Sequence, residues 1–203
     1  MLRTLVLLSG LLFMSLPLSA AEDPAPIETF RIWLDLEIDE TGQVTSAKPV
    51  SKIDDALHDV VVEAARQWIF APMADRNGVP APSTSSTWLE LSLVEGPAGV
   101  LDLQINRLYE GPRPTSMPQP VLRGDVTKIS VVLPVQFVVE KNGKTRDITL
   151  LESGPQQAYN QAAKEAIRTT RFIPRTAAGD AIAVWAVFPV EFQGPGLDAV
   201  LTD

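Results

Sequence analysis

The residues that could do chemistry in this sequence are few and widely spaced. The chain has no cysteine and a single histidine, His58. It therefore offers no thiolate nucleophile, no disulfide and no histidine cluster for a metal. Three carboxylates alternate along one predicted strand, at Asp35, Glu37 and Asp39. Alternate residues share one face of a strand, so these could hold a hard cation such as Ca²⁺ or form a solvated acidic face opposed by Lys48. We favour the solvated face.

No other group of side chains has the spacing of a nucleophile with its base or of a phosphate-binding glycine loop. Arg168, Arg171 and Arg175 cluster at the end of a predicted helix, where they suit the helix dipole or could meet an acidic partner. The chain has 17 Lys and Arg against 25 Asp and Glu, a net charge of −8. This acidic balance argues against nucleic acid as a partner. We expect no enzyme, no cofactor and no metal, and instead a binding or scaffold protein.

Residues 1–21 have the pattern of a cleavable signal peptide. Arg3 gives a short positive region, residues 5–18 give an apolar core, and Ala20 and Ala21 are small residues suited to signal cleavage. The apolar core is short for a bilayer span, which needs about 20 residues. Cleavage after Ala20 or Ala21 predicts a protein in the periplasm. If the leader is not cleaved, the alternative is the inner membrane, with the chain facing the periplasm.

One pattern occurs twice in the rest of the chain. A helical stripe ends at Trp68–Pro72, and a second one ends at Thr170–Pro174, each with an aromatic residue two positions before a proline. Both stripes have the spacing of a helix that is buried on one side. The first comprises Leu57, Val60, Val61, Ala64, Ala65 and Trp68, and the second comprises Tyr159, Ala162, Ala163, Ala166, Ile167 and Thr170.

A hairpin precedes each predicted helix, and a third strand follows it. Asn142-Gly143 is a strong two-residue hairpin turn, whereas Thr41-Gly42 is less diagnostic. The third strands are expected at Trp88–Val94 and Val184–Phe192. The predicted fold class is α+β, with two tandem ββαβ units, each a three-stranded, mainly antiparallel sheet packed on one helix. The first unit covers 28–96 and the second 117–194. Between them lies a proline-containing linker at 97–116 with a short strand at 100–105, and a tail follows at 195–203.

Three segments of the second unit carry a family resemblance: the hairpin Val135–Lys144, the helix exit Ala162–Pro174 and the last strand Phe188–Phe192. In this order they resemble the C-terminal domain of TonB-family energy transducers. The entry segment, Met117–Leu122, is similar to that of the family but has Gln119 where a tyrosine is usual. The first unit shares Phe70-Ala71-Pro72 and Asn77-Gly78, and is expected to be a diverged second copy.

The resemblance implies binding at a sheet edge. TonB-like domains recruit an extended peptide of an outer-membrane receptor by adding it as a strand, which supplies backbone hydrogen bonds. By this resemblance the candidate partner-binding edge consists of Val184, Trp185, Ala186, Val187, Phe188 and Pro189. Trp185 and Val187 would hold side chains of the peptide. The alternative is that Pro189 guards the edge against aggregation and that Trp185 covers the neighbouring domain.

The function expected is that of a periplasmic scaffold in a Gram-negative bacterium, which captures a protein partner by strand addition in outer-membrane transport. An uncleaved leader would instead make the chain a TonB-type transducer, coupled to a proton-driven motor of the inner membrane. Family members carry an anchor with a functional histidine, whereas the one histidine here is His58. An enzyme or small-ligand carrier with a pocket between the units is a further alternative, and so is a homodimer formed by strand exchange.

Overall fold

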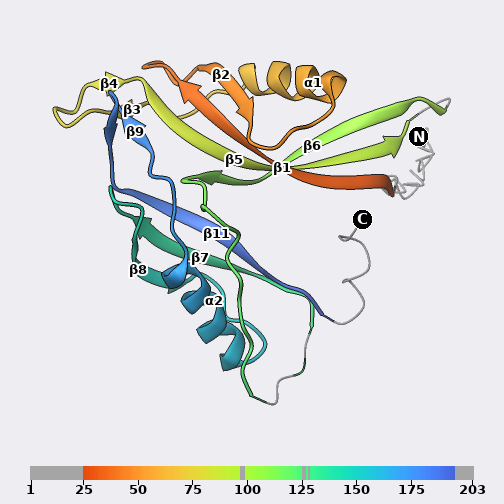
Figure 1. Cartoon of the computed structure of the whole chain (residues 1–203), viewed down its shortest axis with the longest axis vertical. Coiled ribbons are helices and arrows are strands. Elements are labelled where there is room, and N and C mark those ends of the chain that lie inside the picture. Colours follow the sequence, from red (N-terminus) through yellow and green to blue (C-terminus); the bar gives the residue numbers. More distant parts are fainter. Residues whose placement is uncertain (1–24, 97–98, 125–126, 128, 195–203) are drawn as a thin grey trace, which may run out of the picture.

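The computed structural model describes residues 25–96, 99–124, 127 and 129–194. The predicted signal peptide, with both cleavage candidates Ala20 and Ala21, lies outside the described residues, as does the predicted tail. No helix in the described ranges is long and apolar enough to cross a membrane. The described chain forms two units with one helix each. The helices lie at opposite ends of the molecule, and the sheets lie between them (Figure 1).

The N-terminal unit begins with the strand and helix pattern that its apolar periodicity predicts. Its elements are β1 (Pro26–Ile38), β2 (Val44–Pro49), α1 (Asp55–Arg66), β3 (Met73–Ala74), β4 (Pro80–Ala81), β5 (Ser83–Glu95) and β6 (Leu101–Gly111). The Asp54 side chain caps α1 by accepting a hydrogen bond from the Ala56 amide at 2.9 Å. The stripe of α1 is narrower than predicted. Val61 and Ala65 are fully buried, but Val60 is 50% exposed.

The C-terminal unit repeats the order of strand, strand, helix, short hairpin and strand. Its elements are β7 (Val131–Val139), β8 (Thr145–Leu150), α2 (Gln157–Thr169), β9 (Thr176–Ala177), β10 (Asp180–Ala181) and β11 (Val184–Phe192). The predicted stripe of α2 is confirmed, because Tyr159, Ala162, Ala163, Ala166 and Ile167 are all buried. Three antiparallel strands in the order β11-β7-β8 form its sheet, which packs on α2 as predicted.

A glycine turn meets the helix exit in the same way in both units. The Phe70 amide donates to the Gly42 carbonyl at 2.8 Å, and the Phe172 amide donates to the Gly143 carbonyl at 3.0 Å. Both glycines have positive φ, +91° and +76°. A Cβ on Gly42 or Gly143 would lie 2.0 or 2.2 Å from the carbonyl oxygen of the facing phenylalanine. Both turns therefore require glycine.

The sheet of the N-terminal unit is larger than the three strands predicted. Its six strands have the order β10-β9-β5-β1-β2, and β6 also pairs with β5. The hairpin β9–β10 belongs to the C-terminal unit by sequence, yet Ala177 pairs with Ser83, and the Ala178 amide donates to the Pro82 carbonyl at 2.8 Å. This hairpin extends the other unit's sheet because the edge of β5 leaves backbone groups there without a partner.

The predicted linker at 97–116 is wrong over most of its length. Strand β6 fills Leu101–Gly111 and pairs with β5 over ten residue positions, from Glu95–Leu101 to Ser86–Gly111. The prolines that suggested a linker, at positions 97, 112 and 114, flank this strand and do not interrupt it. A proline outside a strand removes no ladder hydrogen bond, so it does not oppose the pairing.

Candidate functional site

Strand β11 is the terminal strand of its sheet, and it contains the six residues predicted to bind a partner. It pairs with β7 in an unbroken antiparallel register, from Val184–Val139 to Phe192–Val131. Its other side has no strand neighbour within the part of the chain that the structure describes. An edge of this kind offers N–H and C=O groups for strand addition.

Two prolines show which backbone groups of β11 point to the open side. Pro189 lies opposite Pro134, and neither can donate to the other. The Pro134 carbonyl instead accepts from the Leu151 amide at 3.0 Å, beyond β8. Since backbone groups alternate in direction along an antiparallel strand, the groups of Trp185, Val187 and Pro189 point away from β7. Pro189 lacks an N–H, so the open edge has donors on both sides of it but not at that position.

The predicted edge residues divide between the surface and the core. Trp185 is 61% exposed and Val187 42% exposed, whereas Ala186 and Phe188 are buried. Val184 and Pro189 are half-buried. Most of the Trp185 side chain is therefore open to solvent. An exposed tryptophan beside open backbone donors can contact the side chains of an added strand.

The buried side of β11 joins the two units through aromatic rings. Phe188 stacks on Trp88 with centroids 6.1 Å apart, and contacts Tyr109 at 4.9 Å. Trp33 stacks on Trp88 with centroids 5.9 Å apart, and contacts Tyr109 edge to face at 5.8 Å. The Tyr109 hydroxyl donates to the Pro112 carbonyl at 2.8 Å, and burial raises the pKa of that hydroxyl well above its ordinary value. The two units therefore share one hydrophobic core at this point.

Arg31 links the C-terminal end of β11 to the N-terminal sheet through ion pairs. Its guanidinium contacts Glu90 at 2.9 Å and Glu191 at 2.7 Å, and lies 5.1 Å from the centre of the Trp88 ring. Burial pulls the pKa of Arg31 down, but the hydrogen bonds to the two carboxylates outweigh this and raise it. The open part of the β11 edge is consequently its first half, around Trp185 and Val187.

Removing the charge of Arg31 is expected to abolish its ion pairs with Glu90 and Glu191 at a modest cost in stability. Arg31→Met should lower the free energy of unfolding by about 1 kcal/mol, because both pairs are partly exposed and screened by solvent. The loss should shrink in high salt, as measured by urea unfolding at two salt concentrations. Arg107→Met is the matched control, since Arg107 lies over the Trp68 ring and forms no ion pair with a described residue. A loss for Arg31→Met that does not depend on salt would contradict this account.

The acidic face predicted on β1 lies partly at the interface between the units. Arg113 binds the Asp35 carboxylate through two hydrogen bonds of 3.1 and 3.2 Å, and Ser86 donates to it at 2.6 Å. Asp39 instead accepts hydrogen bonds within its own turn. The hydrogen bond from the Thr41 hydroxyl is the largest of the effects that lower the pKa of Asp39. In the described ranges no group of three or more acidic or histidine side chains could hold a metal. Asp39 thus lies apart from the other two carboxylates, because Asp35 and Glu37 line one pocket.

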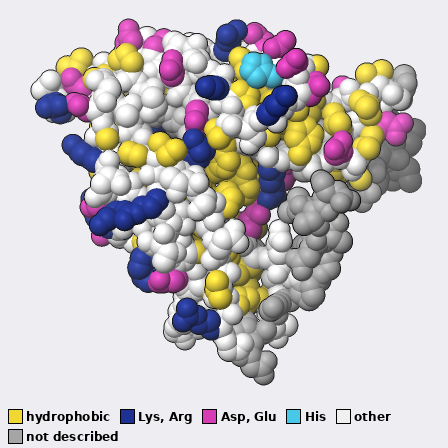
Figure 2. Space-filling model, viewed as in Figure 1, with side chains coloured by type: hydrophobic (Ala, Val, Ile, Leu, Met, Phe, Trp, Pro, Cys, Tyr) yellow, Lys and Arg dark blue, Asp and Glu magenta, His cyan; other side chains and the backbone are white. Residues whose placement is uncertain are grey.

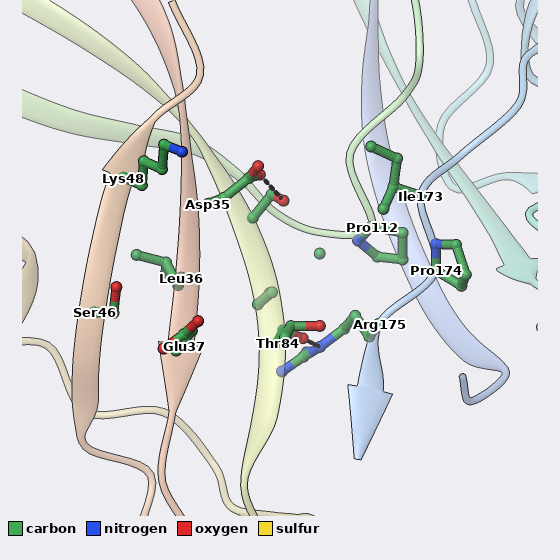
Figure 3. Close-up of a pocket in the computed structure, with 13 residues that line it drawn as sticks. Asp35, Leu36, Glu37, Ser46, Lys48, Thr84, Pro112, Ile173, Pro174 and Arg175 are labelled. Carbon is green, nitrogen blue, oxygen red and sulfur yellow. Dashed lines mark hydrogen bonds between the residues drawn. The ribbon is translucent and has the colours of Figure 1, made fainter. Parts of the chain in front are cut away.

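A pocket of about 290 Å³ lies beside this ion pair, between the units. Lys48 and Glu37 line it from the N-terminal sheet, and Ile173, Pro174 and Arg175 line it from the C-terminal unit (Figure 3). The residues that line it include no histidine, and both signs of charge are present. Its hydroxyl groups include that of Ser86, which donates to Asp35.

The predicted basic cluster at the end of α2 is not one surface. Arg175 turns back to the N-terminal unit, where its Nε donates to the Thr84 carbonyl at 3.1 Å and burial lowers the pKa of its guanidinium. Arg168 pairs with Glu165 on α2, and Arg171 is exposed. Figure 2 shows Lys and Arg side chains mixed with Asp and Glu over the visible face. This face has no large area of one charge for an acidic partner.

The residues that join the units were missed at the sequence level. Trp33 and Trp88 lie on the faces of β1 and β5 that alternation predicted to face outward, and they are directly opposite each other. The sequence did contain one signal for them, their residue type. Two large aromatic side chains on an otherwise polar face indicate that another part of the protein covers that face. Tyr109 on the next strand and Phe188, far along the chain, contact them.

Comparison with known proteins agrees with the geometry of the C-terminal unit. A family model described as the C-terminal domain of the Gram-negative bacterial TonB protein matches residues 125–193, which include β7, β8, α2 and β11. The match does not extend to the N-terminal unit. No curated protein matched the chain. The order of strands, the glycine turn against the helix exit and the family match agree: residues 125–193 of this chain are a TonB C-terminal domain.

Proposed function

We propose that the C-terminal unit captures an extended segment of a protein partner by adding it as a fourth strand beside β11. The observation that carries this is the open edge, where the backbone groups of Trp185 and Val187 point away from β7 and both side chains are exposed. Backbone pairing supplies affinity that depends little on sequence, and Trp185 supplies a contact that depends on the partner's side chains. The arrangement suits a short strand, because Arg31 holds Glu191 farther along.

The family match supports a partner at the outer membrane. TonB C-terminal domains generally bind outer-membrane receptors and act in transport, so we propose a receptor segment as the partner and the periplasm as the site of action. We further propose that the N-terminal unit is a diverged copy, on the basis of its matching glycine turn and element order. A cleaved leader makes the protein a scaffold, and a retained one makes it a transducer. The intact mass of the protein recovered from a Gram-negative host distinguishes these two outcomes.

A photo-crosslinking amino acid at position 185 tests the proposal directly. In living cells it is expected to capture the periplasmic segment of an outer-membrane protein, identified by mass spectrometry. The same amino acid in place of Gln161, which is exposed on α2, is the control. Equal capture from both positions would count against a site at β11.

The captured segment, made as a synthetic peptide, then tests the backbone pairing. Val187→Pro is expected to weaken its binding at least roughly tenfold, because the open edge loses a donor and gains a ring in the path of the added strand. Val187→Ala trims the side chain but keeps the donor, and should retain most of the affinity. Peptide titrations by fluorescence anisotropy measure both. Equal losses in the two variants would mean that side chains, and not backbone pairing, hold the partner.

A further inference from the structure

Strands β5 and β11 occupy corresponding places in the two units. Glu37 and Val138 each lie five residues before the turn glycine of their unit. Glu37 pairs with Thr84 on β5, and Val138 pairs with Trp185 on β11. The same correspondence continues along both strands: Ser86 corresponds to Val187, Trp88 to Pro189 and Glu90 to Glu191. Arg31 binds the two glutamates of this last pair, one in each unit.

The side of β5 that corresponds to the open edge of β11 is occupied. The Trp33 carbonyl accepts from the Val50 amide at 2.9 Å, so the backbone groups of Trp33 point toward β2. Trp33 lies opposite Trp88, and antiparallel strands alternate the direction of these groups. The groups of Ser86, Trp88 and Glu90 therefore point away from β1, toward β6, which pairs with all three positions.

Strand β6 contacts the rest of the N-terminal unit as a bound peptide would. Its backbone groups at Gln104 and Asn106 face β5, opposite Ser92 and Glu90. Leu103 and Ile105 alternate with these residues and pack against the core of the N-terminal unit. The Arg107 guanidinium lies 5.2 Å from the centre of the Trp68 ring. Backbone pairing, alternate apolar side chains and one side-chain contact are the components of peptide recognition by strand addition.

We propose that β5 is a second strand-binding edge and that β6 is its ligand within the same chain. The N-terminal unit is thus closed to partners at β5, whereas the corresponding edge of β11 has no strand neighbour among the described residues. The ligand that β5 accepts is an extended, antiparallel segment with apolar residues at alternate positions, as Leu103 and Ile105 are in β6. This inference concerns the N-terminal unit and does not depend on the partner of β11.

The test uses a fluorescent synthetic peptide of residues 101–111 and a full-length protein in which β6 is released. Gln104→Pro with Asn106→Pro removes two amide donors that face β5, while both side chains are exposed and contribute little to the core. This variant is expected to bind the peptide at least roughly tenfold more tightly than the unchanged protein. Gln104→Ala with Asn106→Ala is the matched control, which keeps both donors and should bind no better than the unchanged protein. All proteins also carry Val187→Pro, so that binding at β11 is not counted.

Methylated peptides show whether the pairing has the direction seen for β6. A peptide with N-methyl groups at positions 104 and 106 should lose binding, and one with N-methyl groups at 103 and 105 should keep it, since those amides point outward. A folded proline variant that gains no affinity would overturn the proposal, as would equal effects of the two methylated peptides. If the proline variant does not fold alone, recovery of its circular dichroism when the peptide is added supports the proposal, and no recovery overturns it.

Discussion

Gly143→Ala is expected to lower the free energy of unfolding by about 2–4 kcal/mol. The added Cβ would lie 2.2 Å from the Phe172 carbonyl oxygen, and the residue must also keep a φ of +76°. Both the turn and the helix exit would have to shift, which breaks the hydrogen bond from the Phe172 amide to the Gly143 carbonyl. Urea unfolding followed by circular dichroism measures the loss.

Variants of two other glycines distinguish the cost of the close contact from the cost of the backbone conformation. Gly42→Ala repeats the contact in the N-terminal unit, at 2.0 Å from the Phe70 carbonyl oxygen, and should cost a similar amount. Gly179→Ala has a φ of +82° but no atom within 4 Å of the new Cβ, so it should cost only about 1 kcal/mol. If Gly179→Ala and Gly143→Ala cost the same, the proposed role of the contact with the helix exit is wrong.

Phe188→Ala is expected to destabilise the protein by about 3–5 kcal/mol and to affect both units. Phe188 is fully buried and contacts Phe172 in its own unit as well as Trp88 and Tyr109 of the other. Its loss leaves a cavity where the two cores meet. Hydrogen exchange measured by mass spectrometry should rise in peptides of β11 and also in peptides of β5 that contain Trp88.

Phe137→Ala is the matched control for this coupling. Phe137 is equally buried, but its aromatic partner is Phe172, within the C-terminal unit. Its loss should destabilise the protein by a similar amount while exchange in β5 stays unchanged under native conditions. If both variants raise exchange in β5 equally, the coupling does not depend on the contact of Phe188 with the N-terminal unit.

The elements were predictable where a local pattern decides them. Alternation predicted the buried face of β1, and Asn142-Gly143 predicted the hairpin of β7 and β8. The helical stripe predicted which side of α2 is buried, because its residues keep the spacing of one helix face. Val60 departed from the prediction, because only Val61 and Ala65 of α1 are fully buried, so periodicity overstated the width of the buried face.

The candidate site was predictable in part. Alternation and the family resemblance placed Trp185 and Val187 on the outward face of an edge strand, where the structure has them. Their role in binding a partner stays a prediction. Neither signal showed that Arg31 would hold Glu191 or that β6 would fill the corresponding edge of β5. Those contacts depend on residues far apart along the chain.

Local patterns along the chain are enough to tell which faces of the strands and helices carry apolar side chains, where the turns lie, and that the second unit has the order of a TonB C-terminal domain. What covers each face, and whether the edge of a given strand is occupied, follows from packing in the folded chain. Trp33 and Trp88 follow the same alternation whether water or Phe188 lies above them, and β6 has the same pattern with or without β5 beside it. Local periodicity records that a surface is apolar, whereas its partner is chosen by packing among residues that the chain brings together only on folding.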